Sequence, residues 1–568
     1  MYLKKILRKG TVLFFITIVV LSTIMLFFIN QKEGWHPDEV FSYGSSNSKY
    51  DNLFYPYGLQ DPLTAVVTER ILDKNVVTMI SNVFSIIANL EDFKSEIRDM
   101  RNSGQPIWKT KEEAKDYVTV STGDSPNYLM VYYNQAKDVH PPLFYFLVNT
   151  VSLFIKGTFS KYIIFSIQII FFTGSCFLIK MTMELLKRAH LSIPVILLYG
   201  LSMGAISTVI FQRMYMMLTF FILCYFYINL KLYFNSFKLT GKLRFAFIIV
   251  LLSGFLTQYY FCVYAGIVAI IMLAMMIREK STKEAKAYFI EHLKAAIIGI
   301  AIYPPAVFHV FISHRSVAAI GESNGNYLQS LSGYIKMSFN AFSMLNILGY
   351  VFFIVLAVAL IYIWKTENKR FVIMLILMPI VVYVLAMSKF TPSVSIRYLT
   401  PIFPFIVIAV VLGIDWLVKN NRTFALLSVI ILIGILPIYG LANGNNFTNN
   451  NSANNLNKGY SKYLEIAKQN KNLKFLYVGM DHYLHIQSIE EFMTYDKSMI
   501  ITKAQLAILE RDDVLKNEKE FILGVHKGLD IDYILLKVLE YSNSSEYELL
   551  IDRGISPTTS IIIYKIHK

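Results

Sequence analysis

Two acidic or histidine-containing groups border the apolar runs of this sequence and could carry out chemistry. The first is His36-Pro37-Asp38-Glu39, whose adjacent carboxylates could supply a general base to a reacting hydroxyl. The alternative is that this segment is a solvated loop that carries two acids. The second is Asp138-Val139-His140-Pro141-Pro142-Leu143-Phe144-Tyr145, where two prolines fix the backbone at a helix start. His140 therefore either begins a helix or meets an anion there.

Two arginines occupy similar positions, each beside a tyrosine. Gln212-Arg213-Met214-Tyr215 separates two apolar runs with almost no loop, and Ser395-Ile396-Arg397-Tyr398-Leu399 precedes another run, with Lys389 near it. Ionisable residues at membrane depth are costly and tend to be functional. Each arginine is either a phosphate ligand or an interfacial anchor that snorkels to lipid head groups. Weaker candidates of the same kind are His309, His314 and Arg315.

Together these groups fit a reaction on a lipid-linked phosphate. Arginine binds phosphate oxygens in a two-pronged contact, and a departing phosphate needs its charge stabilised more than it needs a proton. The acceptor hydroxyl needs one base, and one carboxylate suffices. This is half of the arrangement in inverting glycosidases, with the acid replaced by a good leaving group.

The composition indicates that membrane helices must position these residues. Charged residues make up 16% of the chain, against about 25% in soluble domains, and hydrophobic residues make up 55%. This excludes a soluble globular enzyme, a disordered chain and a disulfide scaffold. The net charge of +15 lies mostly in short loops between apolar runs, so it indicates topology and not nucleic-acid binding. The cysteines, Cys176, Cys224 and Cys262, lie inside apolar runs and lack metal-ligand spacing.

The apolar runs predict about eleven spans plus one re-entrant or interfacial helix. Val12–Ile29 follows four basic residues and predicts an uncleaved helix with a cytoplasmic N-terminus. The further runs are at 139–156, 162–180, 191–211, 213–233, 245–258, 259–277, 295–312, 346–364, 371–388, 399–418 and 424–441. The basic loops that we place in the cytoplasm are 181–190, 231–244, 278–294 and 365–370. With the loop 181–190 in the cytoplasm, run 162–180 starts on the outer side, where the first helix also ends. Run 139–156 lies between these two outer ends, so we expect that it does not cross the membrane.

One alternative topology lets Phe245–Ile277 cross only once. That stretch has 33 residues, which is too long for one span, and Gln258-Tyr259-Tyr260 fits a short outer turn. We therefore expect two crossings.

The segments outside these runs define the predicted domains. Residues 31–138 hold 16 acidic against 11 basic residues, which favours the outer side, and 76–90 predicts a helix on the membrane surface. Residues 1–441 form the transmembrane module, 442–458 an Asn-rich linker and 459–568 a small α/β domain outside the cell. Patterned pieces of that domain lie at 461–469, 474–479, 521–525, 533–536 and 560–566.

In order along about residues 1–420, the four motifs resemble the GT-C superfamily of glycosyltransferases. The nearest likeness is to its protein O-mannosyltransferase and aminoarabinose-transferase branch, which implies an all-α polytopic GT-C fold in the plasma membrane. The resemblance implies Asp38 as base, with Glu39 second, and His140, Arg213 and Arg397 at the donor phosphate. Tyrosines at outer helix ends are expected to line the substrate: Tyr145, Tyr215, Tyr259, Tyr260 and Tyr398. One departure is the loop 313–345, which offers only His314, Arg315 and Glu322 where the family often has a further acid or base.

The same resemblance implies the substrates. The donor is a polyprenyl-phosphate monosaccharide, the anomeric centre is inverted, and neither a metal nor another cofactor is expected. A composition rich in Lys, Asn, Ile and Tyr is typical of a low-GC bacterium and favours an undecaprenyl carrier. The acceptor is a cell-envelope glycan, a lipid or a protein, and we expect membrane lipids but no nucleic acid as partners.

Three other functions compete with this one. A transporter or flippase for lipid-linked sugars requires charged or broken helices near the midplane and related halves, and we find neither in the sequence. A polymerase of lipid-linked sugars gives no reason for the acidic pair after the first helix. A membrane scaffold with a binding domain at its C-terminus leaves all four groups unexplained.

Overall fold

The computed structural model describes most of the chain. The described residues are 2–49, 106–311, 327–342, 370–391, 394–417, 460–480, 484–553 and 561–568, with a few isolated positions between 78 and 92. The predicted runs at 346–364 and 424–441, the linker 442–458, the residues His314, Arg315 and Glu322, and most of 76–90 lie outside them. The count of eleven spans therefore stays a prediction.

The chain forms two compact units, which we call the membrane unit and the mixed unit. The membrane unit comprises Met1–Gln31, Val139–Phe144 and Lys161–Asn451. The mixed unit comprises Lys32–Asp138, Tyr145–Ser160 and Ser452–Lys568. The first loop thus belongs to the same unit as the C-terminal region.

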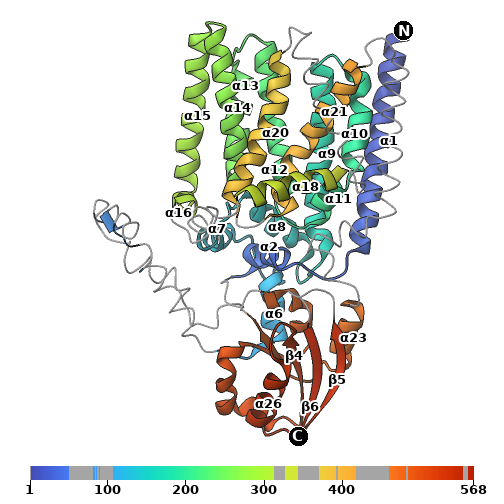
Figure 1. Cartoon of the computed structure of the whole chain (residues 1–568), viewed down its shortest axis with the longest axis vertical. Helices are drawn as coiled ribbons and strands as arrows, with labels where there is room; N and C mark the ends of the chain where they lie inside the picture. The colour runs from blue at the N-terminus through green and yellow to red at the C-terminus, as the bar shows by residue number, and fades with distance from the viewer. Residues whose placement is uncertain are drawn as a thin grey trace. The chain divides into compact units, whose positions relative to one another are not determined.

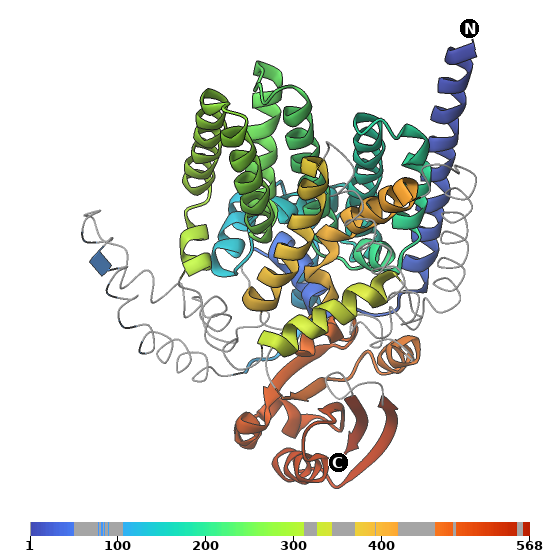
Figure 2. The same ribbon diagram turned by 45° about the horizontal axis from the view of Figure 1, so that its top comes forward.

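Long apolar helices that run side by side build the membrane unit (Figure 1). Among the described residues, five are long and apolar enough to cross a bilayer, so the chain is a multi-pass membrane protein. These five are α1 (Tyr2–Gln31), α9 (Lys161–Leu185), α12 (Tyr215–Phe234), α14 (Tyr260–Arg278) and α20 (Arg370–Phe390). The turned view in Figure 2 shows the same bundle.

The run predicted as one span at 191–211 is broken in the structure. It forms α10 (Ser192–Gly200) and α11 (Met203–Ile210), and the helical axis bends by 62° between them. The hydroxyl of Ser202 caps α11 by accepting a hydrogen bond from the Ala205 N–H at 3.1 Å, so the second helix starts afresh. Hydropathy alone does not reveal this break, because both halves are apolar.

The break predicted at Gln258-Tyr259-Tyr260 is confirmed, since α13 (Gly241–Thr257) ends there and α14 begins at Tyr260. The other helices that the structure describes in this unit are η2 (Ala189–Leu191), α15 (Thr282–Ile302), α16 (Pro305–Phe311), α18 (Tyr327–Phe342), η4 (Ile396–Tyr398), η5 (Thr400–Ile402) and α21 (Phe403–Leu417).

Helix α12 lies inside the bundle and packs against α9, α13 and α14. It is apolar around its whole circumference, as expected for a helix with neighbours on every side. Small residues allow such helices to approach closely. At Gly204 in α11, an added Cβ would lie 2.5 Å from the ring of Phe403 in α21, so the pairing of these two helices requires glycine.

The mixed unit contains a six-stranded sheet in the order β1-β3-β2-β4-β6-β5. Strands β3, β2 and β4 are parallel, and the other neighbouring pairs are antiparallel. The strands are β1 (Lys109–Thr110), β2 (Phe475–Gly479), β3 (Lys497–Thr502), β4 (Glu520–His526), β5 (Glu546–Arg553) and β6 (Ile561–His567). Strand β1 comes from the first loop, so two segments far apart in the sequence complete one sheet.

Helices of the C-terminal region cover this sheet: α23 (Tyr460–Gln469), η6 (Leu484–Ser488), α24 (Ile489–Phe492), η7 (Lys503–Arg511), α25 (Asp513–Asn517) and α26 (Ile531–Ser542). Among the described residues earlier in the chain, the shorter helices are α2 (Pro37–Asn47), α6 (Lys111–Val118), α7 (Tyr128–Lys137), α8 (Leu143–Ser152) and η1 (Leu153–Ile155). Helix α8 has ten residues, too few to span about 30 Å of hydrocarbon. The predicted architecture, a helical membrane protein with a small C-terminal α/β domain, is confirmed.

Candidate functional site

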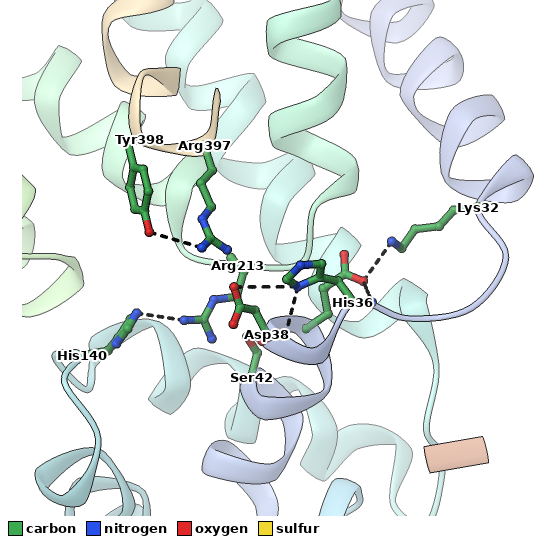
Figure 3. Close-up of polar contacts among 9 residues, drawn as sticks. Lys32, His36, Asp38, Ser42, His140, Arg213, Arg397 and Tyr398 are labelled. Carbon is green, nitrogen blue, oxygen red and sulfur yellow. Dashed lines mark hydrogen bonds and ion pairs between the residues drawn. The ribbon is translucent and has the colours of Figure 1, made fainter. Parts of the chain in front are cut away.

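Arg213 is a buried cation where α11 gives way to α12. It is 5% exposed, and its guanidinium lies 2.8 Å from Nε2 of His140 (Figure 3). A guanidinium has donors only, so His140 accepts through Nε2, and a neutral imidazole then carries its proton on Nδ1. The structure thus joins two of the predicted phosphate ligands in one contact, in which His140 orients Arg213.

Buried polar side chains hold this pair in place. Gln168, in the middle of α9, donates from its amide to the backbone oxygens of Phe211 (3.2 Å) and Arg213. The Tyr303 hydroxyl donates to the backbone oxygen of His140 at 3.4 Å. The turn that carries Arg213 is therefore fixed from α9.

His309 extends this polar cluster. Its Nδ1 lies 2.9 Å from the hydroxyl of Tyr259, and its ring contacts that of Tyr303, with the two centroids 5.8 Å apart. Because Tyr303 also bonds to His140, the weak candidate His309 is linked to the Arg213 pair through one intervening tyrosine.

Tyrosine rings bring the second arginine toward the same region. Arg397 donates to the Tyr398 hydroxyl at 3.2 Å, and its guanidinium carbon lies 5.1 Å from the centre of that ring (Figure 3). The Tyr398 ring in turn packs edge-on against Tyr215 (6.2 Å between centroids) and Tyr260 (5.4 Å). Since Tyr215 follows Arg213 by two residues, the Tyr215–Tyr398 contact joins the two arginine-bearing segments.

In the mixed unit, helix α2 begins at the predicted acidic pair. His36 is its N-cap, and Nδ1 of His36 accepts from the Asp38 N–H at 3.1 Å. Glu39 accepts from the His36 N–H at 2.9 Å, which completes a capping box, and Pro37 fits the first helical position. Local sequence therefore fixes the start of α2.

The two acids have different surroundings, although they are neighbours in sequence. The Glu39 carboxylate is fully buried and lies 2.9 Å from the Lys32 ammonium, which is buried as well. The Asp38 side chain is 14% exposed, with its carboxylate 3.7 Å from the His36 ring nitrogen (Figure 3). Glu39 is therefore engaged by the cap and the ion pair, whereas part of the Asp38 side chain is exposed.

The remaining predicted residues fall as follows. Tyr145 is fully buried in α8, whereas Tyr259 and Tyr260 lie at the junction of α13 and α14. Within the described ranges, no three His, Cys, Asp or Glu side chains gather as a metal site would require.

No protein-family model matches the chain, and no curated protein matches it. Among solved structures, a similar chain is that of ArnT from Cupriavidus metallidurans bound to undecaprenyl phosphate. The sequences are 10% identical, the match covers 75% of this chain and 87% of that chain, and the TM-score is 0.45. A likeness at this level assigns neither a family nor an activity.

Three residues of these clusters were missed by sequence reasoning: Lys32, Gln168 and Tyr303. Gln168 gave a usable signal, because a lone amide inside an apolar helix requires a polar partner. Lys32 also gave a usable signal, because it is a basic residue between the end of the first apolar run and the acidic pair. Tyr303 is one of 37 tyrosines in the chain, and nothing in the sequence separates it from the others.

Proposed function

We propose that this chain is a GT-C-type glycosyltransferase that moves a monosaccharide from a polyprenyl-phosphate carrier to an acceptor hydroxyl outside the cytoplasm. The observation that carries the proposal is the Tyr215–Tyr398 contact, which joins the segments of Arg213 and Arg397. Two arginines that converge in a membrane protein suit an anionic lipid head group better than they suit separate interfacial anchors.

The proposed reaction is a single displacement. The oxygen of the acceptor hydroxyl attacks the anomeric carbon, and Asp38 accepts the proton of that hydroxyl. The bond between that carbon and the phosphate oxygen breaks, and the electron pair leaves with the lipid phosphate. Arg213 and Arg397 stabilise the charge that grows on the departing phosphate. Attack from the face opposite the leaving group inverts the anomeric centre.

His140 has a supporting part in this proposal. As an acceptor for Arg213, it holds the guanidinium in one orientation and adds no second positive charge. A fixed guanidinium presents two parallel donors to phosphate oxygens, which a mobile side chain would do less often.

The test is transfer by the full-length protein in lipid nanodiscs. It is offered short-chain polyprenyl phosphates that carry radiolabelled mannose, glucose, galactose or aminoarabinose, together with an extract of cell-envelope glycans and lipids. We expect release of polyprenyl phosphate from one donor and an inverted linkage in the product. Movement of an intact donor across the bilayer, with no bond cleaved, would instead indicate a transporter.

A further inference from the structure

The C-terminal region is joined to the first loop by specific contacts inside the mixed unit. Strand β1 pairs with β3, where Lys109 is opposite Ser498 and Thr110 is opposite Lys497. The Trp108 indole N–H donates to Asp512 Oδ2 at 2.8 Å, and its ring packs against the apolar core of the α/β domain. These contacts fix the segment that leads into α6.

Helix α6 begins directly after β1 and packs against α2. The hydroxyl of Thr110 accepts from the Glu113 N–H at 3.2 Å and caps α6, so strand and helix form one rigid turn. At the other end of α6, the ring of Tyr117 lies over Gly44 of α2. An added Cβ at Gly44 would lie 2.0 Å from that ring, so a larger residue there would force the ring or the helix to move.

Buried amides complete the attachment of α2. The Asn47 amide donates to the Val118 oxygen at the end of α6 at 2.8 Å. The amide of Asn134 in α7 donates to the Ser48 oxygen at 3.0 Å, and that of Asn149 in α8 donates to the Ser46 oxygen at 2.9 Å. The C-terminal end of α2 is therefore held by three helices at once.

A helix transmits displacement at one end to the other, because its rise of about 1.5 Å per residue is fixed by its hydrogen bonds. Asp38 stands in the first turn of α2, while Gly44 and Asn47 stand in its last two turns. A contiguous path of packed elements thus runs from the α/β domain through β1 and α6 to Asp38.

We propose that the C-terminal α/β domain is a positioning element for Asp38, acting through β1, α6 and α2. This inference rests on the proposed function of Asp38 as base. It assigns the domain a role in holding the base, as distinct from binding the acceptor.

The experiment breaks the Trp108–Asp512 hydrogen bond from each side in the full-length protein. Trp108→Phe removes the donor and keeps an aromatic ring. Asp512→Asn replaces the accepting Oδ2, while Oδ1 can still cap α25 through the N–H groups of Val514 and Leu515. Asp530→Asn is the matched control, because Asp530 caps α26 of the same domain and bonds to Tyr533 instead of the first loop.

Hydrogen–deuterium exchange of peptides covering 37–47 measures the hold on α2 independently of catalysis. We expect faster exchange there in both variants, unchanged exchange in β4, and no effect of Asp530→Asn. We also expect turnover to fall about 10- to 100-fold, as misplacement of a catalytic group by about 1 Å produces. The affinity of each variant for a short-chain polyprenyl phosphate should stay within about twofold of the wild-type affinity, because the phosphate ligands are unchanged. The double variant should match the singles, since both remove the same bond.

The inference is overturned if Trp108→Phe and Asp512→Asn, which lack this hydrogen bond, keep wild-type exchange at 37–47 and wild-type turnover. It is also overturned if raising the concentration of acceptor extract restores full turnover, since the domain would then serve acceptor binding. A third outcome separates the two proposals. If the wild-type protein releases no polyprenyl phosphate from any donor, but the variants exchange faster at 37–47, the result supports the mechanical link and contradicts only the proposed function.

Discussion

Adjacent carboxylates become chemically distinct in this protein because their neighbours differ. Glu39 closes the capping box of α2 and pairs with a buried ammonium, whereas Asp38 keeps part of its carboxylate accessible. The Glu39 oxygens are thus already engaged by the ion pair and the cap, which leaves Asp38 as the acid with an accessible side chain.

Glu39→Gln is expected to destabilise the protein, because it leaves the Lys32 ammonium buried without its charged partner. Removing one member of a buried ion pair costs about 3–5 kcal/mol. The double variant Lys32→Met/Glu39→Gln should recover most of that loss, since it removes both charges. Thermal unfolding in detergent measures the three proteins. Wild-type stability of Glu39→Gln, or a double variant no more stable than the single one, would contradict removal of the charged partner of Lys32 as the cause of the loss.

Lysine is expected to replace Arg213 or Arg397 poorly. A point charge does not reproduce the two-pronged contact with a phosphate that strengthens as the phosphate departs. Each Arg→Lys variant should lower single-turnover transfer more than it weakens donor binding. The double variant should be less impaired than the product of the singles, as for residues that act as a unit.

Arg278→Lys serves as the matched control, because Arg278 lies in the last turn of α14, away from the tyrosine cluster. Full turnover in both lysine variants, or effects that simply multiply, would make the two arginines interfacial anchors.

The sequence predicted the residue types at this scale better than it predicted their contacts. The acidic pair, His140 and the two arginines stood out because charged groups are rare in apolar surroundings. The pairing of His140 with Arg213 was not predictable, since the two residues meet through tertiary packing. The choice between Asp38 and Glu39 stayed open for the same reason, because it depends on burial.

At the scale of elements, the helices with a strong hydropathy pattern were predictable from the sequence, whereas the break within an apolar run and the shortest strand were not. Hydropathy located α9, α12 and α14, and two tyrosines beside a glutamine marked the turn between α13 and α14. The bend between α10 and α11 was missed, because a serine cap inside an apolar run leaves the mean hydropathy unchanged. Strand β1 was missed because its two residues carry no pattern and depend on pairing with β3.

Gly44→Ala tests the packing of α2 on α6. The added methyl group would lie 2.0 Å from the Tyr117 ring, so either the ring or the helix must move. Overpacking of this kind costs about 1–3 kcal/mol, and here it should also lower transfer. The control is Gly123→Ala in the same unit, where an added Cβ has no heavy atom within 4 Å. Equal unfolding temperatures and transfer rates for the two variants would contradict the close contact.

At the scale of the whole molecule, topology decides whether the predicted groups can share one face. Single cysteines placed at Lys187 and Glu284, in a background without the three native cysteines, should resist impermeant thiol reagents in intact cells. A cysteine at Lys471, an exposed position in the C-terminal region, should react. The physical reason is that basic loops stay in the cytoplasm. Labelling at 187 from outside would contradict the eleven-span prediction and, with it, the expected outer position of the four motifs.

Transfer by the Asp38→Asn protein tests the central claim most directly. Wild-type, Asp38→Asn and Glu39→Gln proteins in nanodiscs are compared in single turnovers at saturating polyprenyl-phosphate sugar, with donor binding and folded fraction measured alongside. Asp38→Asn keeps the volume of the side chain and removes the proton acceptor, so transfer should fall by about 10²–10⁴-fold while donor binding and folding stay unchanged. Glu39→Gln should lose folded protein, yet its folded fraction should transfer faster than Asp38→Asn. Turnover of Asp38→Asn within about threefold of wild type would contradict its assignment as the base.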